Sequence, residues 1–235
     1  SEEILTNIIK NGSDIIEIGM PFSDPMADGP TIQLSSNRAI KNGANLDVIF
    51  NICSNLRKIN KDIPIILMGY YNIILHYGLI NFVSKCSSIG IDGLIIVDLQ
   101  PEEDSELYNL LKSSNINLIR LITPTTTQKR LETITKNASG FLYYVTVTGI
   151  TGQNSANITE LKNSIKKIRE YSKLPIVAGF GVNNKNDVRE ICKTTDGVVV
   201  GSSIVKIIEK NINNKDTMIE SINNFIKELK EGTNQ

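Results

Sequence analysis

A carboxylate interrupts an apolar strand near the start of the chain. Residues 14–19 read Asp-Ile-Ile-Glu-Ile-Gly, so Glu17 stands among isoleucines. Burying an unpaired carboxylate is costly and raises its pKa, which lets the group give and take a proton near neutral pH. Side chains alternate faces along a strand, so Glu17 shares a face with Ile15, opposite Ile16 and Ile18. Glu17 is therefore a candidate acid–base catalyst; the alternative is a structural glutamate paired with a buried lysine or arginine.

Two further carboxylates follow in the loop formed by residues 20–31. Prolines flank Asp24, and a Gly-Pro pair follows Asp28. Proline fixes φ and stiffens a loop, and a stiff loop at the end of a strand suits a binding role. The alternative is an ordinary turn in which Asp24 and Asp28 bond their own backbone.

Glycine-rich turns late in the chain are typical of a phosphate site. Residues 175–181 end a strand in Gly-Phe-Gly, and residues 197–204 turn through Gly201 into a helix that starts with serines. Barrel enzymes often bind phosphate with the loops after the last two strands and a helix N-terminus. Residues 149–152, Gly-Ile-Thr-Gly, could add a third edge.

Aromatic residues stand near the predicted strand ends. Tyr70 and Tyr71 follow one strand, and Phe141 and Tyr143 share one face of another. They could stack on a planar ligand or pack in the core, and the pattern does not decide between the two. Together, the carboxylates, glycine turns and aromatics predict a phosphorylated substrate with a planar body.

Composition excludes several other classes of function. The 235-residue chain has a formal net charge of zero and no basic tract, which argues against nucleic acid or an anionic membrane as a partner. No apolar run is long enough for a membrane span, and no signal-peptide pattern opens the chain. The three cysteines lack metal-type spacing, and His76 is the one histidine, so no metal site is predicted.

Strand-like and helix-like runs alternate, which predicts a parallel sheet with helical crossovers in one domain over residues 1–235. The predicted strands are 14–19, 63–68, 92–97, 117–122, 140–145, 174–178 and 196–200. The predicted helices are 2–10, 45–60, 78–89, 102–113, 127–136, 159–172, 184–193, 202–213 and 216–230. A (β/α)8 barrel begins with a strand, whereas this chain opens with a helix, so we expect a TIM barrel that lacks its first strand. An open doubly wound sheet is the alternative.

Several of these segments together resemble the tryptophan synthase alpha chain family. Residues 17–33, Glu-Ile-Gly-Met-Pro-Phe-Ser-Asp-Pro-Met-Ala-Asp-Gly-Pro-Thr-Ile-Gln, are similar to the family's signature almost residue for residue. Residues 67–72, 148–152, 179–182 and 201–206 also match in order. The resemblance covers essentially the whole chain, although the family's opening strand has no counterpart here.

The resemblance implies a (β/α)8 lyase that cleaves indole-3-glycerol phosphate to indole and glyceraldehyde 3-phosphate by a retro-aldol step. It implies that Glu17 is the acid–base group and that Asp28 holds the indole N–H. The positions that match substrate-binding residues are Ile32, Tyr70, Ile95, Tyr143, Thr151, Gly152, Phe180, Gly181, Gly201 and Ser202. Asp24 matches a position that couples the two subunits.

The resemblance also implies a partner and a place in the cell. The partner is a beta chain in an α2β2 heterotetramer, and the beta chain uses pyridoxal phosphate while the alpha chain needs no cofactor. The expected compartment is the cytoplasm, or the plastid stroma for a plastid-encoded chain. Two other functions stay open at this point: a non-catalytic, truncated partner of the beta chain, and a different phosphate-binding barrel enzyme.

Overall fold

The computed structural model describes residues 1–145 and 155–233, with the side chains of 155–157 excepted. The chain forms two compact units, Ser1–Leu118 and Ile119–Gln235. No helix in the described residues is long and apolar enough to cross a membrane.

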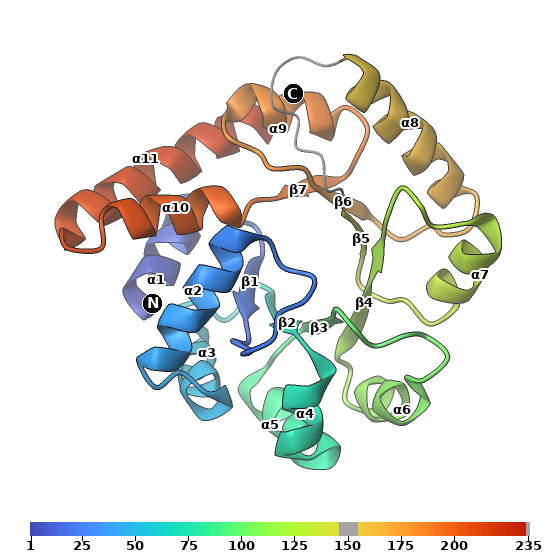
Figure 1. Ribbon diagram of the computed structural model, residues 1–235, viewed down its shortest axis with the longest axis horizontal. Helices are drawn as coiled ribbons and strands as arrows, with labels where there is room; N and C mark the ends of the chain where they lie inside the picture. The colour runs from blue at the N-terminus through green and yellow to red at the C-terminus, as the bar shows by residue number, and fades with distance from the viewer. Residues whose placement is uncertain (146–154, 234–235) are drawn as a thin grey trace. The chain divides into compact units, whose positions relative to one another are not determined.

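The first unit holds three parallel strands and the helices that connect them (Figure 1). The strands are β1 (Ile16–Gly19), β2 (Ile65–Gly69) and β3 (Gly93–Ile96). The helices are α1 (Glu2–Lys10), α2 (Pro30–Lys41), α3 (Leu46–Ile59), α4 (Tyr71–Tyr77), α5 (Leu79–Ile89) and α6 (Ser105–Ser113). Neighbouring parallel strands can be joined only by a crossover, and here each strand leads into helices that pack on the sheet.

Helices α3 and α5 cover the strands of the first unit with apolar side chains at helical spacing. Phe50 and Cys53 of α3 and Phe82 and Cys86 of α5 are almost wholly buried. The rings of Phe50 and Phe82 lie 5.7 Å apart, centroid to centroid. Burial raises the pKa of Cys53 to about 11 and that of Cys86 to about 12, so both stay thiols and act as small core residues.

The second unit repeats the same plan. Its strands are β4 (Asn117–Ile122), which begins at the end of the first unit, β5 (Leu142–Val145), β6 (Ile176–Gly179) and β7 (Gly197–Val199). Its helices are α7 (Gln128–Lys136), α8 (Ser155–Arg169), α9 (Lys185–Cys192), α10 (Ser202–Lys210) and α11 (Lys215–Thr233). Neighbouring strands again pair in parallel, and α11 packs against α9. This contact is close at Gly232, where an added Cβ would lie 2.5 Å from the backbone oxygen of Lys185.

A clamp made of one arginine and one aspartate fixes the amino ends of the strands in the first unit. Asp92 precedes β3, and its Oδ2 accepts bonds from Arg57 Nη2 of α3 at 2.7 Å and from the Ile65 N–H of β2 at 2.8 Å. The backbone oxygen of Pro64 accepts the Ile16 N–H at 3.0 Å, which sets the start of β1.

The second unit contains the same clamp at corresponding positions. Asp196 precedes β7 and accepts bonds from Arg169 Nη2 of α8 at 2.9 Å and from the Ile176 N–H at 2.8 Å. Pro175 accepts the Leu142 N–H at 2.8 Å. The two clamps show that the three-strand groups β1–β3 and β5–β7 are built alike.

The seven predicted strands are confirmed, with ends that differ by up to two residues. Two helices, α2 and α4, were not predicted from the sequence. Helix α2 has no buried residue, so it lacks the apolar period that reveals a helix, and it starts at Pro30, whose fixed φ suits a first helical position. Helix α4 has 7 residues and follows β2 directly, which is too short for a periodic pattern.

Candidate functional site

Glu17 lies on β1 between buried neighbours, as the alternation predicted. Ile16 and Ile18 are 3% and 7% exposed, whereas Glu17 on the opposite face is partly exposed. Desolvation, with a smaller contribution from the negative charge of Asp28, raises the pKa of Glu17 to about 7. Among the residues that the structure describes, no lysine or arginine pairs with Glu17. The group is therefore a desolvated carboxyl rather than half of an ion pair, and it can carry or release a proton near neutral pH.

Asp28 is held by a tyrosine from the end of the neighbouring strand. Tyr70 follows β2, and its hydroxyl donates to Asp28 Oδ2 at 3.2 Å and accepts the Ala27 N–H at 3.1 Å. Burial raises the pKa of Asp28, and the bond from Tyr70 opposes that rise. The carboxylate is thus fixed by a residue 42 positions away rather than by its own turn.

The rest of the loop from Met20 to Gly29 is tied to α2. Ser36 Oγ accepts the Phe22 N–H at 3.0 Å and donates back to the Phe22 oxygen at 3.1 Å. Gln33 Nε2 donates to the Asp28 backbone oxygen at 2.9 Å. Asp24 is exposed, and its carboxylate accepts a bond from Ser23 Oγ. The loop is a fixed platform that turns Asp28 inward and leaves Asp24 on the surface.

Two predicted apolar positions lie elsewhere in the first unit. Ile95 on β3 is fully buried and lies in register with Met68 of β2. Ile32 lies in the first turn of α2, directly after the loop, and is partly exposed. Their contact with a ligand stays a prediction.

The glycine-rich turns of the second unit are joined by a serine. Ser203 of α10 donates to the backbone oxygen of Val182 at 2.7 Å, which links the turn after β7 to the turn after β6. Gly181 has φ of +61°, a conformation that favours glycine. The Phe180 side chain is buried against Tyr144, with ring centroids 6.2 Å apart.

The amino end of α10 is open to an anion. Gly201 is its N-cap and provides no capping side chain, and the first turn contains no acidic residue. Gly201 and Ser202 are both exposed. Free N–H groups at this end carry partial positive charge, as phosphate binding requires.

Tyr143 of β5 lies against Gly179 of β6. A Cβ at Gly179 would fall 2.8 Å from Tyr143 Oη, so only glycine leaves room for the ring. Tyr143 is 9% exposed, so the side chain packs in the core of the second unit. Its contact with a ligand stays a prediction. Thr151 and Gly152 lie outside the described residues.

Each unit thus assembles part of the predicted site. The first unit brings together Glu17, Asp28 and Tyr70, and the second brings the turns after β6 and β7 together. Sequence reasoning missed the roles of Ser36 and Ser203 because each acts through a bond to a distant backbone group. Their places beside a proline-rich loop and a glycine turn were the available signals.

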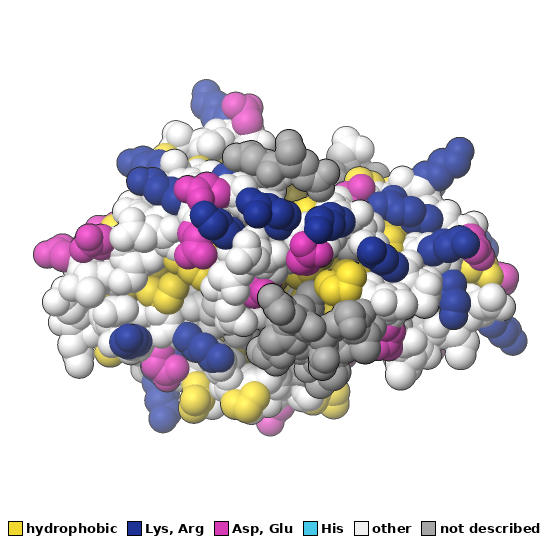
Figure 2. Space-filling model, turned by 90° about the horizontal axis from the view of Figure 1, so that it is seen from above, with side chains coloured by type: hydrophobic (Ala, Val, Ile, Leu, Met, Phe, Trp, Pro, Cys, Tyr) yellow, Lys and Arg dark blue, Asp and Glu magenta, His cyan; other side chains and the backbone are white. Residues whose placement is uncertain are grey.

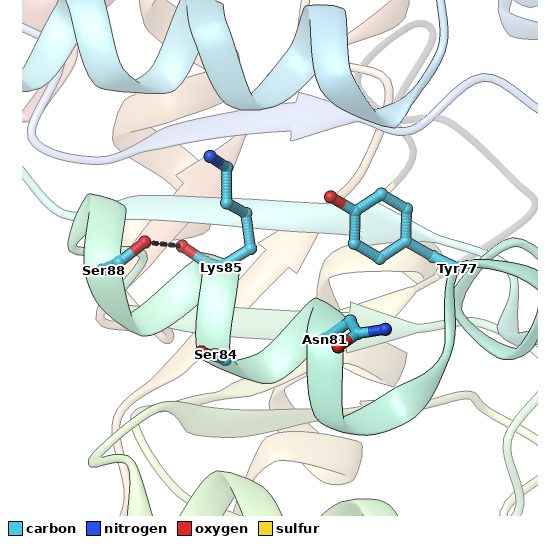
Figure 3. A pocket seen from close by; sticks show the side chains of 5 residues that line it. All are labelled: Tyr77, Asn81, Ser84, Lys85 and Ser88. Carbon is cyan, nitrogen blue, oxygen red and sulfur yellow. Dashed lines mark hydrogen bonds between the residues drawn. The ribbon is translucent and has the colours of Figure 1, made fainter.

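A polar hollow of about 380 Å³ lies on α4 and α5 and contains none of these residues (Figure 3). Its lining consists of Tyr77, Asn81, Ser84, Lys85 and Ser88. It carries no carboxyl for proton transfer.

In the described part of the chain, no group of three or more histidine, cysteine, aspartate or glutamate residues could hold a metal ion. On the face shown in Figure 2, basic and acidic side chains are interspersed.

Comparison with known sequences agrees with this geometry. The family model described as tryptophan synthase alpha chain matches residues 1–234. The chain is 42% identical over 230 residues to the tryptophan synthase alpha chain of Petrotoga mobilis, covering 98% of this chain and 89% of the relative. It is 45% identical over 216 residues to that of Desulfosudis oleivorans, covering 92% and 81%.

Comparison with solved structures gives the same result. Tryptophan synthase subunit alpha from Legionella pneumophila matches with a TM-score of 0.90 at 31% identity, covering 99% of this chain and 86% of that chain. The aminoacrylate-bound tryptophan synthase from M. tuberculosis matches with a TM-score of 0.87 at 25% identity, with the same coverage. These matches confirm the (β/α)8 barrel class over an open doubly wound sheet, and the described residues contain seven of its strands.

Proposed function

Because the chain belongs to the tryptophan synthase alpha chain family, we propose that it is a carbon–carbon lyase acting on indole-3-glycerol phosphate. The products are indole and glyceraldehyde 3-phosphate. The observation that carries this proposal is the desolvated Glu17 carboxyl, whose pKa is raised to about 7, beside Asp28. Such a group is present in both protonation states at neutral pH, as a residue that both gives and takes a proton must be.

Glu17 moves the protons of the retro-aldol step. It donates a proton to the indole carbon that carries the glycerol chain and takes the proton of the adjacent glycerol hydroxyl. The bond between that carbon and the chain breaks, its electron pair returns to the ring, and the chain leaves as the aldehyde. One proton enters and one leaves, so the charge balances without an oxidant or reductant.

Asp28 stabilises the positive charge that develops on the ring. Once the indole carbon is protonated, the ring nitrogen carries that charge, and a carboxylate that accepts its N–H lowers the barrier. The bond from Tyr70 supports this role because it favours the ionised form of Asp28. Asp28 therefore acts as the anion of the pair, while Glu17 carries the proton.

The turns after β6 and β7 bind the phosphate. We assign this role to the backbone of Phe180, Gly181, Gly201 and Ser202, supported by the uncapped end of α10 and the bond from Ser203 that joins the two turns. We also assign substrate-binding roles to Ile32, Tyr70, Ile95, Tyr143 and Thr151 and a phosphate-binding role to Gly152; Thr151 and Gly152 lie outside the described residues.

The partner in this proposal is a tryptophan synthase beta chain in an α2β2 assembly. We assign the subunit-coupling role to Asp24, which is exposed in the loop after β1 and therefore accessible to a partner. Pyridoxal phosphate belongs to the beta chain, the alpha chain works without a cofactor, and the complex resides in the cytoplasm or plastid stroma.

The test replaces the side-chain carboxyl of Glu17 with a carboxamide. Glu17→Gln keeps the size of the side chain and removes the proton transfer, so we expect cleavage of indole-3-glycerol phosphate to fall by at least about 10²-fold. Cleavage at the parent rate would refute the assignment. Measuring the parent chain alone and with a beta chain separates a lyase from a partner without activity of its own, because such a partner would release no indole in either case.

A further inference from the structure

One hydroxyl joins the catalytic loop to the end of β2. Tyr70 Oη accepts the Ala27 N–H at 3.1 Å and donates to Asp28 Oδ2 at 3.2 Å. The Tyr70 ring is 3% exposed and lies 5.3 Å from the Phe22 ring, centroid to centroid. A hydroxyl has one proton to donate, and the amide of Ala27 occupies its oxygen, so the proton points at Asp28.

The Tyr70 hydroxyl bonds only one of the two carboxyls of the site and therefore affects their pKa values differently. Burial raises the pKa of both Glu17 and Asp28, and the charge of Asp28 raises that of Glu17 further. The bond from Tyr70 lowers the pKa of Asp28 alone. A hydrogen bond to the charged form of a carboxyl favours its ionisation, so the Tyr70 bond favours Asp28 as the anion of the two.

Among the described residues, the charged group outside this pair that acts on Tyr70 is also acidic. Asp98 follows β3, acts on Tyr70 through its charge and accepts the Tyr71 N–H at 2.7 Å. Asp24 lies in the same loop as Asp28, but it is exposed. In the described residues no lysine or arginine pairs with Glu17 or Asp28, so the Tyr70 hydroxyl is the group that sets the two apart.

We propose that Tyr70 is a positioning residue that holds Asp28 as the anion and so leaves Glu17 as the proton carrier. It acts by fixing the loop through Ala27 and by stabilising the charged form of Asp28. The proposal rests on the lyase function above and extends it, because it names the group that decides which carboxyl is the acid.

The test removes the hydroxyl and keeps the ring. Tyr70→Phe retains the packing on Phe22, so the variant should fold. We expect the two carboxyl titrations to move toward each other, by about half a pH unit or more, as read from 13C NMR of the Asp and Glu side chains. The bell-shaped pH profile of cleavage should narrow, and kcat should fall about 10-fold or more with a smaller change in KM, because a bond to a charged group is lost.

The chain offers a matched control. Tyr77 Oη donates to Asp47 Oδ1, also at 3.2 Å, so Tyr77→Phe removes the same kind of bond elsewhere. Parent-like titrations are expected for this variant. If Tyr70→Phe keeps the parent spacing of the two titrations, or if Tyr77→Phe narrows it equally, the proposal is wrong. A parent chain that fails to cleave the substrate would refute the lyase function, whereas the NMR titrations would still decide the role of Tyr70.

Discussion

Removing the acid of Glu17 should make the protein more stable at alkaline pH. Folding raises the pKa of this carboxyl from 4.5 to about 7, so the folded state binds the proton more tightly than the unfolded chain does. Below about pH 4.5 both states are protonated and folding has no cost from this group. As the pH rises through 7 the folded state must also ionise, and the full cost is then present.

The size of the effect follows from the two pKa values. The difference between 4.5 and about 7 corresponds to about 3 kcal/mol of stability lost above neutral pH. Glu17→Gln has nearly the same shape and no charge, so we expect its free energy of unfolding to exceed that of the parent by about 1–3 kcal/mol at pH 8.5. At pH 4 the two proteins should differ little, while cleavage is lost at every pH.

Urea denaturation at several pH values measures this difference. Glu103→Gln is the matched control, because Glu103 is exposed and the same substitution there should leave the pH dependence unchanged. A Glu17→Gln protein that is no more stable than the parent at pH 8.5 would refute the reasoning. That result would mean that the carboxyl is well hydrated in the folded state, and its role as a proton carrier would fall with it.

Three further substitutions test other parts of the structure. Asp28→Asn removes the charge that raises the pKa of Glu17, so NMR titration should find that pKa below its parent value, and cleavage should drop strongly but less than in Glu17→Gln. Gly232→Ala would place a Cβ 2.5 Å from the backbone oxygen of Lys185, and we expect it to lower the free energy of unfolding in urea by about 1–3 kcal/mol; parent stability would show that α9 and α11 can move apart freely. Asp92→Ala deletes the acceptor of its clamp and should cost about 1–2 kcal/mol by the same measurement, an estimate that a change within error would contradict.

The strands and the central carboxylate could be predicted because their signals are local. Buried parallel strands are continuous apolar runs, and a charged residue inside such a run is visible from its immediate neighbours. Glu17 therefore stood out, and its raised pKa agrees with that prediction. The glycine turns after β6 and β7 were visible for the same reason.

The features that the sequence did not reveal depend on distant contacts or on weak patterns. The bond between Tyr70 and Asp28 spans 42 positions, so no local pattern marks Tyr70 as the partner. Ser203 donates to the backbone oxygen of Val182, and the identity of a residue does not reveal that its backbone accepts such a bond. Helix α2 buries none of its residues, and the periodic pattern that identifies a helix is therefore weak.

The presence of one arginine–aspartate clamp in each unit bears on the effect of substitutions. Asp92 and Asp196 lie at the amino ends of strands, whereas Asp28, Tyr70 and the glycine turns follow the carboxyl ends of strands. The clamps and these loop residues of the candidate site therefore lie at opposite ends of the strands. The two clamps share no residue, so the loss of one aspartate removes no hydrogen bond of the other clamp.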